Sequence, residues 1–403
     1  MLESTENTNI TESISCLLPY EITEEQWTFY FNCSSFLKGF ASLFIGLAGI
    51  VLNVLSSYII LESVLAASFF NWMLVCLSIF NVLFLCNSVF EGLKSLLGSI
   101  DFYDVLFVRF LFPLKSIVMC CSIYTTILLA WERYDTFKMR VPHYPNPRRK
   151  RDLKTYFLWY RLRIIRFVGP ILIFATVFYI PKWFELRLKP QLDFCSINKT
   201  LKLCSTEQLT IELSGVRNNP DYIFWYLNIA NMFITALGPL LILAYLNINI
   251  YINLKRFIIK KKTSAQVLSN LSEATDSRQT RNMKMKRKCE MDLIRQTILL
   301  FVIVIFFFLS HVLRIALNIE EFESLYHVKE AEEKGCAWLR YWTILAVPVS
   351  NLLLQINSSM GFLIYCVFNK TFRKTLNAKL WRANQTLPNK IEMSKNRRKT
   401  LQE

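Results

Sequence analysis

Charged side chains placed inside or beside long apolar stretches are the residues of this sequence that could do chemistry. Glu132, Arg133 and Tyr134 close an apolar run that begins near Asp104. If that run is a helix that crosses a bilayer, the triplet lies at the membrane boundary. An arginine there either snorkels to the interface or pairs with the adjacent carboxylate. The pattern therefore indicates an ion pair at one end of a membrane helix.

A second group of polar residues lies deeper within the apolar stretches. Lys115 precedes Arg133 by 18 residues, which is about 27 Å along a helix. A bare ammonium at that depth needs a partner or water. Lys115 either forms a buried pair with an acid such as Glu91, or it faces a ligand cavity and meets an anionic or carbonyl group there. His311 and Arg314 share one helix face, and they either line such a cavity or make interhelical hydrogen bonds.

Catalytic motifs are missing from the sequence. It contains no Walker loop, no H-E-x-x-H and no nucleophile elbow, and its three histidines are scattered along the chain. We therefore expect no enzyme, no metal site and no cofactor.

The elements that must position the charged residues are long apolar segments. Of the 403 residues, 53% are hydrophobic and 19% are charged, against about a quarter charged in soluble domains. The 32 Phe and ten Gly fit lipid-facing helices better than the alternating strands of a β-barrel. We predict an all-α membrane protein with a bundle of seven transmembrane helices over residues 37–368. The predicted spans are 39–61, 68–90, 104–131, 163–182, 222–249, 296–318 and 341–368.

The distribution of basic residues predicts the orientation of these spans. A net charge of +17 would suggest nucleic acid if it were spread over a soluble domain. The basic clusters at 148–151, 255–262, 278–288 and 370–379 instead fall on one side of alternating spans, which indicates the cytoplasmic side. We therefore expect a multi-pass protein of the plasma membrane, with membrane lipids and no nucleic acid among its partners.

The two ends of the chain follow from this topology. Residues 1–36 hold six acids and no Lys or Arg, so we expect an extracellular tail. Apolar residues repeat every fourth position among basic ones over 369–381, which predicts a short amphipathic eighth helix on the inner leaflet. Residues 382–403 are polar and basic, and we expect a disordered cytoplasmic tail. Three glycosylation sequons fall on the outer side, at Asn9, Asn32 and Asn198.

The E-R-Y triplet at the inner end of the third predicted span resembles the signature of rhodopsin-like G-protein-coupled receptors. Asn53 matches the asparagine of the first helix in these receptors, and segment 71–81 is similar to their N-x-x-L-x-x-L-A-x-x-D. The resemblance implies that Arg133 pairs with its neighbouring acid when the receptor is inactive and meets a heterotrimeric G protein when it is active. It implies coupling or activation roles for Glu132, Arg133, Tyr134, Tyr365, Asn53 and Asn247.

The chain departs from the pattern of these receptors at several positions. Asn81 replaces the acid of the second span and Gly361 replaces an asparagine of the seventh, so sodium is not expected as a modulator. The top of the third span has no cysteine for the usual bridge to the outer loop. A bridge between Cys195 and Cys204 is the simplest alternative. Bridges to the cysteines of the tail or to Cys336 are equally possible, and an odd outer count leaves one over.

Four segments resemble the invertebrate FMRFamide-type neuropeptide receptors, a branch of the rhodopsin-like class. They are I-P-K-W-F-E at 180–185, R-N-N-P-D-Y at 217–222, S-H-V-L-R-I-A-L-N at 310–318 and N-S-S-M-G-F-L-I-Y-C at 357–366. In this order on seven spans, the resemblance covers residues 39–380. Nematode chemoreceptors of a related branch share much of the pattern. Glu185 and Tyr222 lie where they either line the mouth of a ligand cavity or serve packing. Lys115, His311, Arg314 and Glu91 are the further candidates to line that cavity.

The resemblance implies a G-protein-coupled receptor for an extracellular ligand, with an amidated FMRFamide-like peptide as the favoured one. A chemosensory receptor for a small acidic molecule, which Lys115 would suit, is the alternative within this class. A transporter or channel built on seven helices is the alternative from another class, although the halves of the chain show no repeat.

Overall fold

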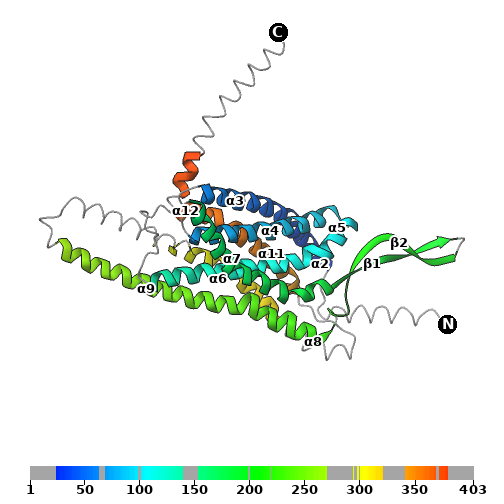
Figure 1. Ribbon diagram of the computed structural model, residues 1–403. Helices are drawn as coiled ribbons and strands as arrows, with labels where there is room; N and C mark the ends of the chain where they lie inside the picture. Colours follow the sequence, from blue (N-terminus) through cyan, green and yellow to red (C-terminus); the bar gives the residue numbers. More distant parts are fainter. Residues whose placement is uncertain are drawn as a thin grey trace, which may run out of the picture.

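The computed structural model describes residues 24–62, 69–98, 101–138, 153–197, 200–217, 219–269, 294–320 without 295, 296 and 299, 341–368 and 372–379. Its helices run back and forth along one direction and form an elongated bundle, from one end of which a two-stranded ribbon projects (Figure 1). We name the end with the ribbon the hairpin end. The opposite end, where one helix finishes at Lys138 and another starts at Leu153, is named the distal end.

Most helical segments join into longer continuous helices with local changes of pitch. Wide π-type turns interrupt three of them, at η1 (Phe36–Ala41), η3 (Phe107–Leu111), η5 (Ile223–Ala230) and η6 (Phe233–Leu237). The α-helices are α2 (Glu24–Ser35), α3 (Ser42–Glu62), α4 (Phe69–Leu97), α5 (Asp101–Leu106), α6 (Phe112–Lys138), α7 (Leu153–Phe178), α8 (Pro220–Tyr222), α9 (Gly238–Ser269), α11 (Tyr341–Ser359) and α12 (Gly361–Phe368). A short 3-10 helix, η4 (Ile180–Phe184), follows α7, and residues 300–320 are helical.

Six helical segments among the described residues are long and apolar enough to cross a membrane. They are Glu24–Leu61, Phe69–Leu97, Asp101–Thr136, Leu162–Phe184, Ile223–Asn253 and Leu300–Glu320. The predicted seventh span, α11 with α12, is not among them, because several residues of α11 are polar. Three of these are buried, Ser350, Gln355 and Ser358, and Gln355 Nε2 donates to Ser42 Oγ of α3 at 2.8 Å. The structure thus supports a helical membrane bundle, and the three buried polar residues of α11 face its interior.

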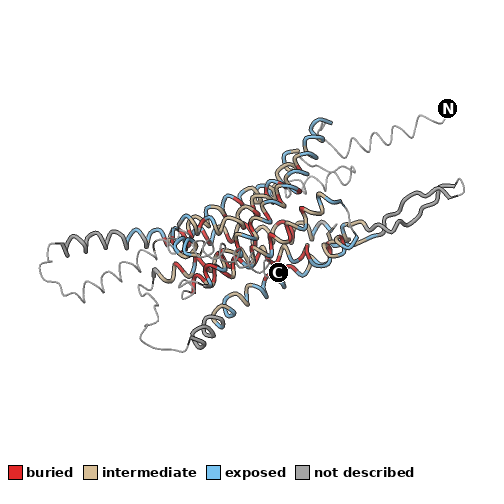
Figure 2. The backbone as a smooth tube through the Cα atoms, turned by 90° about the horizontal axis from the view of Figure 1, so that it is seen from above, coloured by how far each residue is buried: buried red, intermediate tan, exposed pale blue. Residues whose placement is uncertain are grey.

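Burial is arranged as expected for a bundle surrounded by lipid. Buried residues lie in the centre of the bundle and exposed ones outside (Figure 2). Large apolar side chains nevertheless remain exposed, such as Phe44 at 76% and Ile173 at 67%. In water so many exposed apolar groups would be unfavourable, whereas lipid solvates them. The main core lies among α3, α4, α6, α9 and residues 300–307, around Phe70, Met73 and Leu129.

Two features of the fold differ from the sequence-based expectation. The first helix begins at Glu24, so the last part of the predicted tail 1–36 is helical; two acids in its first turn favour that start. The long outer loop folds into a β-hairpin, so the fold is not entirely α-helical. Strands β1 (Leu186–Ile197) and β2 (Thr200–Leu213) pair antiparallel, with a bulge near Pro190, which has no N–H to donate.

The predicted eighth helix is described only in part. Residues 372–379 are helical, and Phe372 is fully buried with its ring centroid 5.7 Å from that of Phe362 on α12. Leu376 packs against the same core. These two apolar residues therefore contact the bundle, and a membrane-surface position of segment 369–381 stays a prediction.

At Gly49 the backbone of α3 lies close to α11 and α4. A Cβ atom there would lie 2.1 Å from Ser359 Oγ and 2.8 Å from Leu85 Cδ1. We expect Gly49→Val to destabilise the bundle by about 1–3 kcal/mol through overpacking, measured as a lower midpoint of thermal inactivation in detergent. Gly169→Val on α7 is the control, since the nearest atom to its Cβ, Ile165 Cγ2, is 4.0 Å away. An equal loss in both variants would contradict the packing argument.

Candidate functional site

Arg133 is enclosed near the distal end of α6. The residue is 3% exposed, and its Cζ lies 3.6 Å from the centroid of the Phe70 ring on α4. Its Nε is 3.2 Å from Glu132 Oε2, but the N–H does not point at that oxygen, so the contact is an ion pair without a hydrogen bond. The guanidinium thus lies against a carboxylate and an aromatic face, which both favour a desolvated cation.

Residues on either side of Arg133 make contacts that hold this end of α6 in place. Thr136 Oγ1 donates to the Glu132 carbonyl at 2.7 Å, and Tyr134 packs against the main core. Tyr365, predicted to act in activation, lies on α12, and its side chain falls outside the described part. The structure therefore brings Glu132 and Arg133 together and leaves the role of Tyr365 a prediction.

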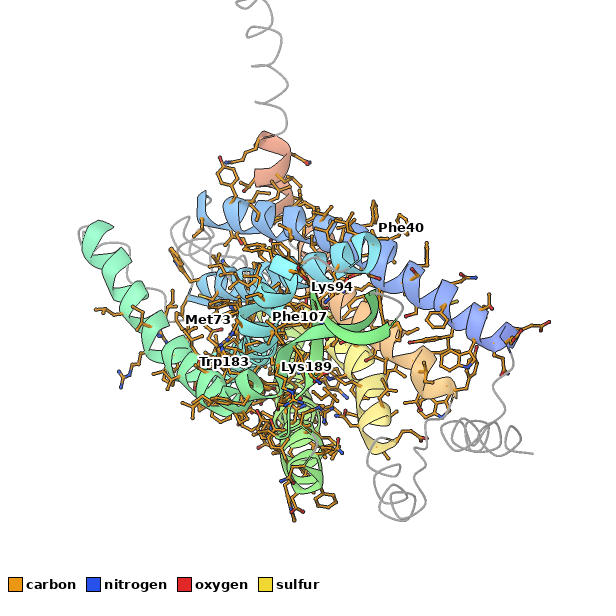
Figure 3. The ribbon with its side chains drawn as sticks, turned by 90° about the vertical axis from the view of Figure 1, so that its right-hand side faces the viewer. Phe40, Met73, Lys94, Phe107, Trp183 and Lys189 are labelled. Atoms are coloured by element: carbon orange, nitrogen blue, oxygen red, sulfur yellow. The ribbon has the colours of Figure 1, made fainter. Side chains whose placement is uncertain are left out.

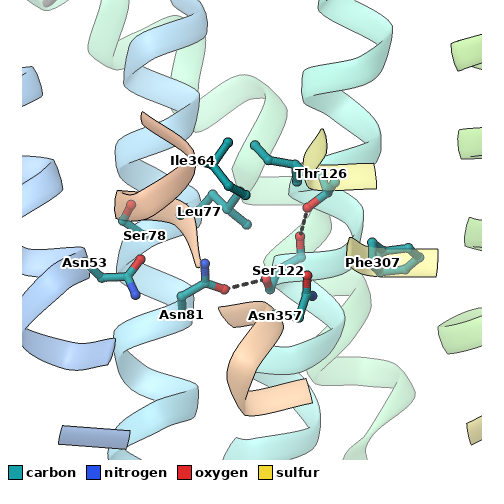
Figure 4. Close-up of a pocket in the computed structure, with 11 residues that line it drawn as sticks. Asn53, Leu77, Ser78, Asn81, Ser122, Thr126, Phe307, Asn357 and Ile364 are labelled. Carbon is teal, nitrogen blue, oxygen red and sulfur yellow. Dashed lines mark hydrogen bonds between the residues drawn. The ribbon is translucent and has the colours of Figure 1, made fainter. Parts of the chain in front are cut away.

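A polar cavity of about 30 Å³ lies in the interior between α3, α4, α6 and the last helices (Figure 4). Ser122 Oγ donates to Asn81 Oδ1 at 2.9 Å, and Thr126 Oγ1 donates to the Ser122 carbonyl at 2.9 Å. Asn81 and Gly361, the two positions predicted to have lost a sodium ligand, both line this cavity. None of the eleven lining residues carries a carboxylate. The cavity is therefore neutral and suited to water.

Asn53 and Asn247 make different kinds of contact. Asn53 Nδ2 donates to the Gly49 carbonyl at 2.8 Å and to the Ser358 carbonyl at 2.9 Å, which fastens α3 to α11. Asn247 Nδ2 donates only within its own helix, to the Leu243 carbonyl at 2.7 Å, among the described residues. Asn53 thus holds two helices together, whereas Asn247 is a buried side chain of α9.

Lys115 forms an ion pair with Glu91, which is one of the two alternatives that the sequence left open. The side chains are 22% and 34% exposed, so the pair keeps some access to water. The ammonium also lies 5.9 Å from the centroid of the Phe84 ring. Because each charge already has a partner, neither residue offers a free charge to a ligand.

A second ion pair, which the sequence did not single out, joins Lys94 of α4 to Asp104 of α5. Asp104 is 2% exposed, and the ammonium lies 5.3 Å from the ring centroid of Tyr103 and 5.6 Å from that of Phe107. Lys94 and Phe107 lie close together in the view from the hairpin end (Figure 3). This pair ties the ends of the second and third spans together.

Glu185 is the centre of a buried network at the hairpin end. The residue is 1% exposed; Lys182 Nζ donates to its Oε2 at 2.9 Å and the Tyr222 hydroxyl to its Oε1 at 2.7 Å. Lys182 also lies 5.1 Å from the centroid of the Phe112 ring. The network thus joins the fourth, fifth and third spans.

His311 and Arg314 face the interior one helical turn apart. His311 Nδ1 lies 3.0 Å from the Phe307 carbonyl and 3.1 Å from Ser310 Oγ, and its Nε2 is buried without a hydrogen-bond partner in the described structure. Arg314 Nη1 donates to Met119 Sδ at 3.1 Å. His311 and Met119 line one cavity of about 30 Å³. Arg314 thus contacts Met119 on the third span, and His311 lines a cavity together with that residue.

Several predicted sites lie outside the described residues or stay predictions. Asn9 and Asn198 are outside, whereas Asn32 is exposed on α2. Cys195 lies opposite Lys202 and Cys204 opposite Asp193, so the two cysteines are diagonal neighbours in the ribbon. The side chains of both cysteines fall outside the described part, so their bridge stays a prediction. Cys33 is a free thiol in the described structure.

Sequence reasoning missed Lys182 and Met119. Lys182 lies three residues before Glu185, a spacing at which opposite charges meet on a helical turn, so its pairing was readable. Met119 carries no such signal, because a thioether has no charge and methionine is a usual core residue. Its contact with Arg314 depends on how the third and sixth spans face each other.

The comparisons with known proteins relate the chain to one membrane receptor. No protein-family model matches the sequence. The chain is similar to the FMRFamide receptor of Drosophila melanogaster, with 27% identity over 263 residues. The match covers 65% of this chain and 38% of that receptor, so the chain spans less than two-fifths of the length of this relative. Together with the helical bundle, this similarity supports a relationship to membrane receptors and selects no particular member.

Proposed function

We propose that this chain is a rhodopsin-like G-protein-coupled receptor for an amidated FMRFamide-like peptide. The observation that carries the proposal is Arg133, a guanidinium buried between Glu132 and the Phe70 ring at the distal end of a membrane bundle. Charged side chains inside membrane segments are costly and usually have a function, and binding of a signalling partner is such a function. The similarity to the Drosophila FMRFamide receptor supports the ligand class.

The proposed orientation places the distal end in the cytoplasm and the hairpin end outside the plasma membrane. The basic clusters between spans support it through the preference of Lys and Arg for the inner side. The proposal includes α11 with α12 as the seventh span and a heterotrimeric G protein as the partner. An occupied outer cavity would favour the state in which the contact between Arg133 and Glu132 is broken.

Nucleotide exchange tests this function. The full-length chain is reconstituted in nanodiscs with purified heterotrimeric G proteins of several classes, and GTPγS binding is measured with and without the peptide Phe-Met-Arg-Phe-amide. We expect a saturable rise in exchange with at least one G-protein class. Absence of any rise with every class, together with absence of basal exchange above empty nanodiscs, would contradict the receptor assignment.

A receptor for a small acidic molecule is the second candidate. It is favoured by Arg314, which forms no ion pair with a carboxylate in the described structure. A guanidinium without a carboxylate partner attracts carboxylates. A panel of small carboxylic acids in the same exchange assay distinguishes this candidate, since only the acids would then raise exchange.

A further inference from the structure

We propose that Phe70 is a positioning residue, which holds Arg133 in the resting state through the face of its ring, and that Arg133 leaves this ring to meet a G protein. The inference deepens the proposed function and rests on it for the partner that Arg133 meets. It adds a contact from another helix to the contact with the adjacent carboxylate. Together these two contacts set the activity of the chain without ligand.

The partners of the Arg133 guanidinium come from two helices. Glu132 is the preceding residue of α6, so it moves together with Arg133 and does not tie it to another span. The Nε atom of Arg133 has no hydrogen-bond acceptor in the part of the chain that the structure describes. The Phe70 ring belongs to α4, and its centroid lies 3.6 Å from Cζ, well within the range of a cation–π contact. Among the described residues, Phe70 therefore supplies the interhelical contact of the guanidinium.

Two successive phenylalanines at the start of α4 contact two arginines. Neighbouring residues of a helix point about 100° apart, so the rings of Phe69 and Phe70 face different helices. Phe70 is 1% exposed and belongs to the main core, as does Leu129, one turn before Arg133 on α6. Phe69 faces α7, where Arg163 Cζ lies 4.3 Å from its ring centroid. The Phe69 ring thus provides a matched contact that does not involve the triplet.

An aromatic partner suits a cation that has to be released. Separation of a buried ion pair leaves two charges without compensation, whereas a phenyl ring carries no charge and needs no new partner after the cation has left. Arg133 and Phe70 are both buried, so little water weakens their contact. A desolvated cation–π contact changes an equilibrium constant by about thirtyfold. This factor keeps most molecules in the resting state, and binding of a ligand and a G protein can overcome it.

Fluorinated phenylalanines at position 70 test the contact with little change in side-chain volume. Replacing one, two and three ring hydrogens by fluorine weakens the negative face of the ring stepwise. The three analogues are introduced at Phe70 of the full-length chain in nanodiscs, and basal GTPγS exchange by purified G proteins is measured without peptide. We expect exchange to rise with each fluorine, reaching about three- to tenfold for the trifluoro analogue.

The same analogues at Phe69 are the control, since that ring contacts Arg163 instead. Basal exchange should stay within about twofold through this series. Phe70→Leu removes the ring and should raise basal exchange at least as far as the trifluoro analogue, because no cation–π contact remains. Phe69→Leu should leave basal exchange within about twofold.

A second readout needs no G protein. Phenylglyoxal modifies accessible guanidinium groups, and mass spectrometry gives the rate of modification at Arg133, which is 3% exposed in the resting state. We expect this rate to rise in parallel with basal exchange through the Phe70 series, about three- to tenfold for the trifluoro analogue, and to stay constant through the Phe69 series.

The outcomes separate this inference from the proposed function. A modification rate at Arg133 that does not rise with fluorination of Phe70, or that rises equally in the Phe69 series, overturns the role of Phe70; exchange stimulated by peptide would then leave the receptor function standing. A rising rate without rising basal exchange, in a chain that responds to peptide, overturns the claim that the ring sets the basal activity. A rate that rises only in the Phe70 series, in a chain that drives no exchange with any G protein, supports the contact and overturns the proposed function instead.

Discussion

Replacing Arg133 by alanine is expected to abolish signalling and to leave the chain folded in the membrane. The guanidinium is 3% exposed, next to Glu132 and over the Phe70 ring, and α6 is held by other contacts of the core. We expect GTPγS exchange stimulated by Phe-Met-Arg-Phe-amide to fall at least about thirtyfold. Surface expression and peptide binding should stay within about twofold, because the ligand binds at the other end of the bundle.

A neighbouring arginine provides the matched control. Arg163 Cζ lies 4.3 Å from the centroid of the Phe69 ring, so it has the same kind of aromatic contact one residue away on α4. Arg163→Ala removes a similar cation from the same region without touching the triplet, and exchange should stay within about threefold of the unaltered chain. Equal losses in Arg133→Ala and Arg163→Ala would reduce the effect to packing at the distal end.

Basal exchange tests the same residue without any ligand. Glu132→Gln removes the charge that holds Arg133, so it should shift the population toward the open state and raise basal exchange about two- to tenfold. Adding Arg133→Ala to Glu132→Gln should cancel this rise, since the released group is then missing. A rise that persists in the double variant would remove Arg133 from the mechanism.

The apolar centres of the spans were predictable from the sequence, and their ends were not. Lipid requires about twenty apolar residues per span, which is a strong signal in composition. Beyond the hydrocarbon a helix continues or stops according to capping and tertiary contacts, which leave weaker traces. The first helix therefore starts at Glu24 and α9 continues to Ser269, both outside the predicted spans. The β-hairpin was missed although apolar residues alternate through Leu186, Leu188, Leu192 and Phe194, because Pro190 inside the run argues against a strand.

The candidate site was predictable as far as it depends on neighbours in sequence. Glu132 and Arg133 are adjacent, and their contact needed only the helix end. The partner of Lys115 was left between two alternatives, because rotation of α6 against α4 decides whether its ammonium meets Glu91 or an open cavity. The contact of Arg314 with Met119 could not be predicted either, because it depends on the rotation of the sixth span against α6.

Removal of the Glu185 carboxylate is expected to give the largest loss of stability. In Glu185→Ala the ammonium of Lys182, whose side chain is 13% exposed, loses the carboxylate that lies 2.9 Å away, and the Tyr222 hydroxyl loses its acceptor. An uncompensated buried charge costs about 3–5 kcal/mol. We expect a large fall in the midpoint of thermal inactivation and in surface expression, measured on the full-length chain.

A surface carboxylate with two partners shows whether burial is the cause. Glu212 on the hairpin is 35% exposed and lies 3.3 Å from Arg187 Nη2 and 3.2 Å from Lys189 Nζ. Although Glu212 has two cationic partners, Glu212→Ala should cost less than about 1 kcal/mol, because water screens exposed pairs and solvates the charges left behind. Equal losses from Glu212→Ala and Glu185→Ala would contradict the assignment of the effect to desolvation.

The double variant separates the charge from the packing. Lys182→Met with Glu185→Ala removes both charges, so only the lost hydrogen bond to Tyr222 and the missing side-chain volume remain. We expect the double variant to be more stable than Glu185→Ala alone by about 2–3 kcal/mol, since a buried ion pair contributes little beyond cancelling its own desolvation. Equal unfolding temperatures of the two variants would contradict a cost from the unpaired Lys182 charge. Glu185 would then stabilise the outer ends of the spans through packing and its hydrogen bond to Tyr222.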